Sequence, residues 1–246
     1  MKILIAGAEQ LYPGSSVNWT LETKAFFEQD SGVHCDCSMD PEGMESYDAV
    51  IVPGDVPDVH PGYWGGQPGD FCKYDRGMDQ AQFDLIDHAV ALRKPLLGIC
   101  RGHQLISAYF GATLEQDIPR GEIHRYAPDA APKFHRTYSV PGTKTFQKLG
   151  AVSLTNSLHH QAVLTVPACL QVTQLWSPDK ETASKYLNMA QHGTLKQGNA
   201  DCIIEAVRHK DYPFWGLQWH PEMRGKYLCE HICLEKVRLI FYSMFS

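Results

Sequence analysis

The chain is most informative where it reads Pro95-Leu96-Leu97-Gly98-Ile99-Cys100-Arg101-Gly102-His103-Gln104. A short apolar run ends at a cysteine that has one glycine two residues before it and another two residues after it. This pattern predicts a strand, a sharp turn and a helix that present Cys100 as a nucleophile. Gly98 and Gly102 would remove the Cβ atoms that crowd each other across the turn. The free N–H groups and dipole of the following helix would favour a thiolate over a thiol.

Apolar runs alternate with helical patterns along the chain. We expect strands at 3–6, 49–52, 95–100, 170–176, 201–207 and 214–219, and helices at about 17–28, 83–90 and 226–245. This alternation predicts an α/β fold in which helices cover both faces of a mainly parallel sheet. Ligands of such sheets bind at the carboxyl ends of the strands, where both Cys100 and His220 lie.

The composition is typical of a globular protein of 246 residues with a formal net charge of −6. No basic tract with interleaved aromatic residues is present, so nucleic acid is not an expected partner. No apolar run reaches the roughly 18–20 residues that span a bilayer, so no membrane is expected either. The start of the chain is too short in apolar residues for a secretory signal. Eight scattered cysteines then favour a reduced, cytoplasmic location.

Two stretches lack a clear period. Residues 52–77 are rich in Pro, Gly and Asp and follow a strand end, which suggests a functional loop. Residues 177–200 are polar, and we interpret them as an exposed lobe or lid in a single domain that spans 1–246. Residues 121–151, with several Pro and His, allow no clear interpretation.

A metal site is one hypothesis for Cys229, His231 and Cys233, which alternate along the chain. However, Cys229 and Cys233 share one helical stripe with apolar residues of the last predicted helix, so we expect both thiols in the core. No metal is therefore expected at this motif, and no cofactor is expected because the cysteine–histidine–glutamate chemistry described next needs no metal.

Another strand leads into Gly216-Leu217-Gln218-Trp219-His220-Pro221-Glu222. Pro221 would fix a turn that lets Glu222 approach the imidazole of His220. His220 would take the proton of Cys100 and later give it to the leaving group, while Glu222 would hold the imidazole in the required tautomer.

A third strand ends at Val52-Pro53-Gly54-Asp55. The backbone N–H groups of Gly54 and Asp55, with that of Arg101, would bind the oxyanion of a tetrahedral intermediate. Gly-x-Cys-x-Gly and His-Pro-Glu each also occur in purely structural roles. Their combination, with both partners at strand ends, favours catalysis.

These motifs resemble the class I glutamine amidotransferase superfamily and, within it, the γ-glutamyl hydrolase branch (peptidase family C26), which includes γ-glutamyl-γ-aminobutyrate hydrolase. The segments that carry the resemblance are 53–61 with Tyr63, 98–104, 111–118, 156–162 and 218–222. The resemblance extends over most of the chain, from the first strand to Glu222.

The resemblance implies a three-layer, flavodoxin-like sandwich with a Cys-His-Glu triad. The implied reaction is hydrolysis of a γ-glutamyl amide through a γ-glutamyl thioester on Cys100. Arg101 would contribute its backbone N–H, while its side chain braces the turn. The residues implied to hold the glutamyl group are Gln104, Ser157, His159, His160 and Gln161. A structural pair on a loop is the alternative for His159 and His160.

The chain departs from the family pattern at two points. Gly54-Asp55 stands where Gly-Gly is usual, so Asp55 adds a Cβ and a negative charge beside the developing anion. Asp55 would point away, or it would contact a cationic part of the substrate. The connection at 177–200 is also longer than in most relatives, which suggests a particular substrate or partner.

Three functions remain open from the sequence. The first is a stand-alone hydrolase that acts on a small-molecule γ-glutamyl substrate. The second is a glutaminase subunit that takes glutamine and passes ammonia to a separate synthetase chain. The third is a non-catalytic binding protein on the same fold. The first two share the thioester step and differ in the leaving group, an alkylamine or ammonia.

Overall fold

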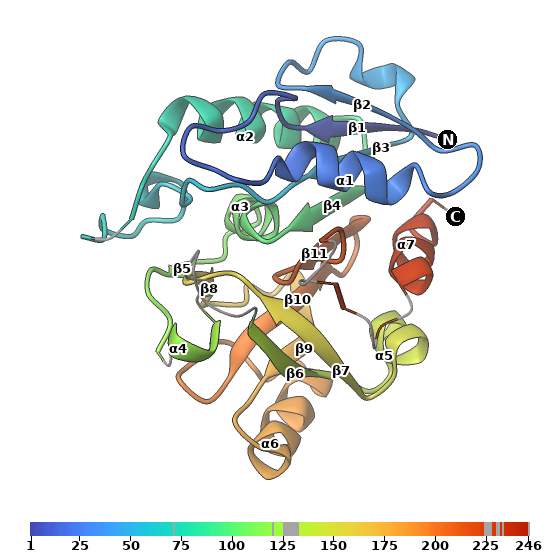
Figure 1. The fold of residues 1–246 in the computed structure, drawn as a ribbon. Coiled ribbons are helices and arrows are strands. Elements are labelled where there is room, and N and C mark those ends of the chain that lie inside the picture. Colours follow the sequence, from blue (N-terminus) through green and yellow to red (C-terminus); the bar gives the residue numbers. More distant parts are fainter. Residues whose placement is uncertain are drawn as a thin grey trace.

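A single sheet runs through the molecule in the order β2-β1-β3-β4-β11-β10-β9-β6-β7 (Figure 1). This computed structural model describes residues 1–70, 72–119, 121–124, 133–223, 228–229, 232 and 234–245. The strands are β1 (Lys2–Ala6), β2 (His34–Ser38), β3 (Ala49–Val52), β4 (Leu96–Ile99), β5 (Leu114–Glu115), β6 (Lys133–Ser139), β7 (Val152–Ser157), β8 (Ala162–Val163), β9 (Leu170–Trp176), β10 (Ile203–His209) and β11 (Phe214–Leu217). The helices are α1 (Trp19–Phe27), α2 (Arg76–Ala91), α3 (Arg101–Tyr109), α4 (Gly121–His124), α5 (Lys144–Leu149), α6 (Lys180–Gln191) and α7 (Leu234–Tyr242).

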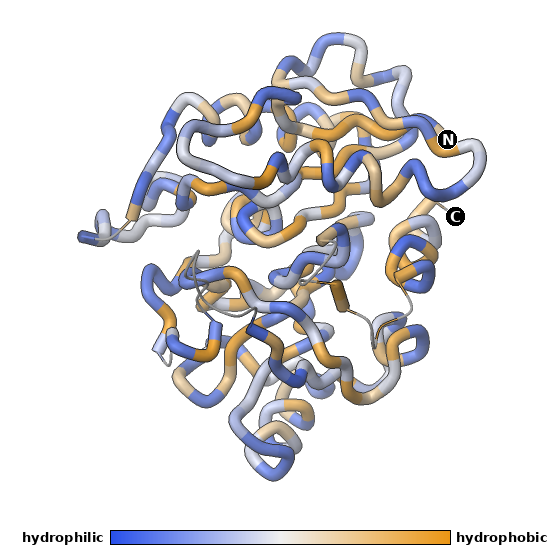
Figure 2. Tube along the Cα trace, viewed as in Figure 1, coloured by the Kyte–Doolittle hydropathy of each residue, from blue (hydrophilic) through white to orange (hydrophobic). Residues whose placement is uncertain are grey.

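Helices cover both faces of the parallel half of the sheet, as the sequence predicts. Successive side chains of a strand point to opposite faces. Ile5 of β1 therefore packs in one cluster with Phe27 of α1 and Phe241 of α7. Its neighbour Leu4 packs in another cluster with Leu85 of α2. Figure 2 shows hydrophobic residues concentrated along the inner strands. The three-layer α/β fold is thus confirmed.

The second half of the sheet differs from the expected parallel arrangement. β2, β1, β3, β4 and β11 are parallel, whereas β10, β9, β6 and β7 pair antiparallel to their neighbours. The six expected strands are present, and β9 has the expected limits. β6 was not anticipated because polar residues, among them His135 and Thr137, occupy its buried positions.

Residues 180–191 form the helix α6 instead of an aperiodic loop. Ala183 and Ala190 are buried in the core, and Tyr186 and Leu187 pack against it. These four positions follow the i, i+3, i+4, i+7 spacing of a helix face. The aperiodic interpretation of this part was therefore wrong. That the wider 177–200 segment acts as a lid stays a prediction.

Cys229 lies in the core, as expected, but the helix predicted from about residue 226 was wrong there, because Cys229 is not helical and α7 begins at Leu234. Its sulfur accepts a hydrogen bond from the Asn156 backbone N–H at 3.3 Å, and burial raises its pKa to about 12. His231 and Cys233, the other members of that motif, lie outside the described residues.

A membrane-crossing helix would need a long apolar run. None of the helices in the described ranges is both long enough and apolar enough to cross a bilayer.

Candidate active site

Cys100 occupies a strained turn between β4 and α3. Its backbone has φ +50° and ψ −108°, and Arg93 is the other non-glycine residue with positive φ in the described ranges. A Cβ on Gly98 would lie 2.6 Å from the backbone nitrogen of His103, and one on Gly102 would lie 2.0 Å from the backbone oxygen of Val52. The two glycines therefore allow β4, the turn and α3 to pack this closely, and the turn presents the thiol.

The substitution Gly102→Ala should strongly destabilise the fold. The new methyl would overlap the Val52 carbonyl, which is backbone and cannot move without displacing β3. We expect a loss of about 3 kcal/mol or more, measured by denaturant unfolding. The matched control is Gly77→Ala, at an exposed position in the first turn of α2, where the nearest atom would be 3.4 Å away. That control should be neutral or slightly stabilising, because alanine favours helices. Equal stability of the two variants would contradict the packing argument.

The structure brings His220 and Glu222 together with Cys100. The Nδ1 of His220 lies 2.7 Å from Oε1 of Glu222, and both side chains are buried. A Cβ on Gly54 would lie 2.7 Å from Cε1 of His220 and 3.5 Å from Cβ of Cys100, so the imidazole lies against the cysteine. Burial lowers the pKa of His220, but the nearby Cys100 and Glu222 outweigh burial and raise that pKa to about 10. The site therefore favours an imidazolium.

Two residues that the sequence did not single out hold the histidine. The Asn156 side chain, on β7, accepts a hydrogen bond from the backbone N–H of His220 at 2.8 Å and donates one to the backbone carbonyl of His220 at 2.8 Å. The Trp19 ring of α1 lies 4.4 Å from the imidazole, centroid to centroid. Asn156 belongs to a motif that resembles the family, so it could have been found. Trp19 carries no such signal.

A chain of amides reaches the Cys100 sulfur. Gln104 donates from Nε2 to the Gln161 carbonyl at 3.0 Å and to Oε1 of Gln218 at 3.1 Å. Gln218 in turn donates from Nε2 to the Cys100 Sγ at 3.6 Å. Gln218 lies inside the 216–222 motif but was assigned no role. The network fixes the polar groups on one side of the nucleophile.

Of the expected oxyanion donors, Gly54 lies against Cys100 and His220, and Arg101 directly follows Cys100 in the chain. Across the described residues, the backbone N–H groups of Gly54 and Asp55 have no hydrogen-bond acceptor. Arg101 is the first residue of α3, so its N–H has no partner within the helix. The Asp55 carboxylate accepts from the Val56 N–H at 2.7 Å, and burial raises its pKa. Burial disfavours a negative charge on Asp55, whereas the hydrogen bond from the Val56 N–H stabilises that charge.

The Arg101 side chain is buried and turned away from these donors. Its guanidinium donates to Asp79 and Gln82, both on α2. Burial raises the pKa of Asp79, while Arg101 opposes that rise. This buried pair ties α3 to α2, which agrees with a bracing role.

Ser157, the last residue of β7, and the histidines that follow it contact two different parts of the molecule. Ser157 donates to the His124 carbonyl at 3.1 Å, and His159 lies beside Glu205. His160 instead reaches the loop after β3, where its Nε2 lies 2.8 Å from the Asp58 carboxylate. Of the five residues implied to hold a glutamyl group, Gln104 is connected to Cys100 through Gln218, and Gln161 joins this chain through its backbone carbonyl.

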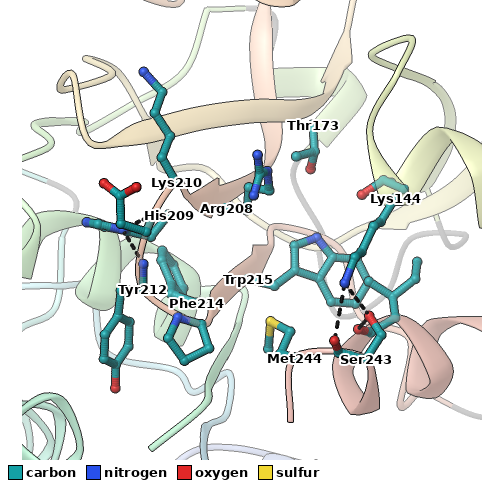
Figure 3. Close-up of a pocket in the computed structure, with 14 residues that line it drawn as sticks. Lys144, Thr173, Arg208, His209, Lys210, Tyr212, Phe214, Trp215, Ser243 and Met244 are labelled. Atoms are coloured by element: carbon teal, nitrogen blue, oxygen red, sulfur yellow. Dashed lines mark hydrogen bonds between the residues drawn. The ribbon is translucent and has the colours of Figure 1, made fainter. Parts of the chain in front are cut away.

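A separate cavity of about 340 Å³ lies at the other end of β11 (Figure 3). Phe214, the first residue of β11, lines it, whereas His220 follows the last residue of that strand. Lys144 also lines the cavity, and its ammonium group donates to the Ser243 backbone carbonyl at 3.2 Å and to the Ser243 hydroxyl at 3.1 Å. This cavity is therefore not part of the Cys100 site.

The fold is shared with solved amidotransferase structures. A glutamine amidotransferase from Thermotoga maritima has a TM-score of 0.55 and 15% identity, over 90% of this chain and 76% of that one. A provisionally assigned GMP synthase component from Thermoplasma acidophilum has a TM-score of 0.62 and 16% identity, over 100% and 94% of the two chains. The fold is thus that of the class I glutamine amidotransferases.

The sequence comparison assigns the family. The Peptidase C26 family model matches residues 36–222, so this chain belongs to the Peptidase C26 family. Protein NtpR of Enterococcus hirae is 33% identical over 144 residues, which are 56% of this chain and 52% of NtpR. The γ-glutamyl-γ-aminobutyrate hydrolase PuuD of Escherichia coli is 26% identical over 220 residues, 80% and 77% of the two chains. The chain thus spans about half the length of NtpR.

Proposed function

We propose that this protein is a cysteine-dependent hydrolase of γ-glutamyl amide bonds, with Cys100, His220 and Glu222 as its catalytic residues. The arrangement of Cys100 carries the proposal: a strained backbone presents its thiol beside a histidine that is held by a carboxylate at 2.7 Å. Membership of Peptidase C26 and the similarity to PuuD support the choice of γ-glutamyl substrates.

In the first half-reaction, the Cys100 thiolate attacks the γ-carbonyl carbon of the substrate. The oxyanion of the tetrahedral intermediate accepts hydrogen bonds from the backbone N–H groups of Gly54 or Asp55 and of Arg101. Protonated His220 gives its proton to the leaving nitrogen, the C–N bond breaks, and the amine departs. A γ-glutamyl thioester remains on Cys100.

In the second half-reaction, water attacks the thioester carbonyl. His220, now neutral, takes one proton of that water, and the C–S bond breaks to release glutamate and the thiolate. Glu222 stabilises the imidazolium in both halves and keeps Nδ1 protonated, so that Nε2 exchanges the proton. Water is consumed, and one acid and one amine are produced.

The second candidate is a glutaminase subunit whose leaving group is ammonia for a separate synthetase chain. Its support is the likeness over the whole chain to the provisionally assigned GMP synthase component. That likeness shows a shared fold, whereas PuuD matches in sequence. We therefore place hydrolysis of γ-glutamyl amines first and expect the two candidates to differ in leaving group and in partner dependence.

A leaving-group screen tests this choice. The purified protein should hydrolyse γ-glutamyl amines, including γ-glutamyl-γ-aminobutyrate, at least about tenfold faster in kcat/KM than glutamine, measured as released glutamate. The rates should not change when cell extract is added, with Cys100→Ala protein in the same extract as the blank. Weak glutaminase activity that rises sharply with extract would favour the amidotransferase role. No turnover of any γ-glutamyl compound would overturn both.

A further inference from the structure

Three histidines and one glutamate converge in the antiparallel half of the molecule. His124 ends α4, His135 lies on β6, His159 follows β7, and Glu205 lies on β10. One potential ligand atom from each lies within 4.8 Å of all the others. Oε1 of Glu205 lies 3.4 Å from Nε2 of His135, 3.8 Å from Nδ1 of His124 and 3.9 Å from Nε2 of His159. All four residues are at most 5% exposed.

The polar atoms of this cluster have almost no protein partners. Both oxygens of Glu205, both ring nitrogens of His135 and Nε2 of His124 and His159 have no hydrogen-bond partner in the described parts of the chain. Buried polar groups are nearly always satisfied, and each unsatisfied one costs free energy. The nearby Trp176 ring, 4.9 Å from His124, adds an apolar wall. One potential ligand atom from each of the four side chains could be satisfied by a single ion that contacts all four.

We propose that His124, His135, His159 and Glu205 bind one divalent transition-metal ion, and that Zn²⁺ is the ion they fit. Three imidazole nitrogens and one carboxylate oxygen are donors that Zn²⁺ accepts in tetrahedral sites. Ligand atoms of such a site lie about 3.3 Å apart, because each bond is about 2.0–2.1 Å long. To reach that spacing, the observed separations of 3.4, 3.8 and 3.9 Å from Glu205 need to contract by about 0.1 to 0.6 Å.

The surroundings of His159 match those of a metal ligand. Metal-bound histidines usually donate their other ring N–H to a carboxylate or backbone carbonyl. The Nδ1 of His159 lies 2.9 Å from the Gln161 carbonyl, while its Nε2 faces Glu205. The same carbonyl accepts the hydrogen bond from Gln104 that begins the amide chain to Cys100. The ion would thus hold the 159–161 segment beside the site and take no part in the bond-breaking steps.

The proposal revises the expectation that the protein needs no metal. That expectation concerned the triad and the 229–233 motif, and this cluster includes neither. A fully bound ion would cross-link α4, β6, β10 and the segment after β7, so its main effect should be on stability. A buried polar cluster without metal is the competing explanation, and it predicts that a chelator leaves the Tm unchanged.

Metal content and thermal stability together test the site. The untagged full-length protein should contain about one zinc per chain by plasma mass spectrometry. Removing it with a chelator should lower the Tm by about 10 °C or more, and added Zn²⁺ should restore the Tm. Co²⁺ in its place should give the visible absorption of a tetrahedral nitrogen–oxygen site.

Matched variants separate a metal site from a structural cluster. Glu205→Gln and His135→Ala should lose the zinc and the response to chelator, whereas His192→Ala, at the exposed end of α6, should keep both. If His135→Ala fails to fold, the wild-type chelation experiment still decides. The proposal is overturned if the wild-type protein holds no metal and its Tm does not respond to Zn²⁺, Mn²⁺, Fe²⁺ or Co²⁺. Retained zinc in Glu205→Gln would equally remove Glu205 as a ligand.

Discussion

Cys100→Ala should reduce γ-glutamyl hydrolysis by about 10⁴-fold or more while the protein stays folded. The thiol supplies the attacking atom, and the His220 imidazole, with Glu222 at 2.7 Å, lies against it. The alanine keeps the Cβ and should disturb little of the surrounding packing, so the Tm should change little. Steady-state turnover and thermal unfolding measure the two quantities separately.

The matched control is Cys169→Ser, a partly buried thiol that donates to the Phe110 carbonyl. Its turnover should stay near that of the wild type. The glutamine-like alkylator 6-diazo-5-oxo-norleucine should label Cys100, and peptide mass mapping identifies the labelled thiol. Unchanged turnover of Cys100→Ala, or label spread over Cys35 and Cys72, would remove Cys100 from the mechanism.

Glu222→Gln should lower kcat by about 10²–10⁴-fold and leave KM nearly unchanged. The amide keeps the size of the carboxyl but removes the charge that stabilises the imidazolium at 2.7 Å. The negative surroundings raise the pKa of His220 to about 10, so removing one of them should lower that pKa. The alkaline limb of the kcat/KM profile, where the imidazolium loses its proton, should therefore move to lower pH.

Glu181→Gln, on the exposed first turn of α6, provides the matched control and should leave the rate and the pH profile unchanged. A large rise in KM at constant kcat in Glu222→Gln would contradict the orienting role. It would place Glu222 in contact with the substrate. A profile that keeps its alkaline limb would show that another group sets the protonation of His220.

Local signals in the sequence predicted four of the five parallel strands, all except β2, and the proximity of Cys100, His220 and Glu222. Each of these residues follows or lies near the end of an apolar strand, and parallel strands bring their carboxyl ends to one edge. The strained turn was predictable because Gly98 and Gly102 stand where a Cβ would meet backbone atoms. The assignment of catalytic roles still depends on the experiments above.

The sequence revealed β9 and β10 of the antiparallel half as strands, but the rest of that half was hidden for physical reasons. Its strand β6 buries polar residues, so it lacks the alternation of apolar and polar side chains that marks a half-buried strand. The histidine–glutamate cluster draws its members from positions 124, 135, 159 and 205, and no spacing rule connects them. The α6 stripe was visible in the sequence, but small residues such as Ala183 and Ala190 made it weak.

The hydrogen bonds between Asn156 and His220 join the strand β7 to the segment that leaves β11, although β10, β9 and β6 stand between these strands in the sheet order. The sheet must therefore curl until its last strand lies beside that segment. A substitution in β7, the last strand of the sheet, would change the position of the His220 imidazole without any change in the turn that carries Cys100. Substitutions in this edge strand would thus alter activity at a distance from the nucleophile, which makes β7 a target for engineering.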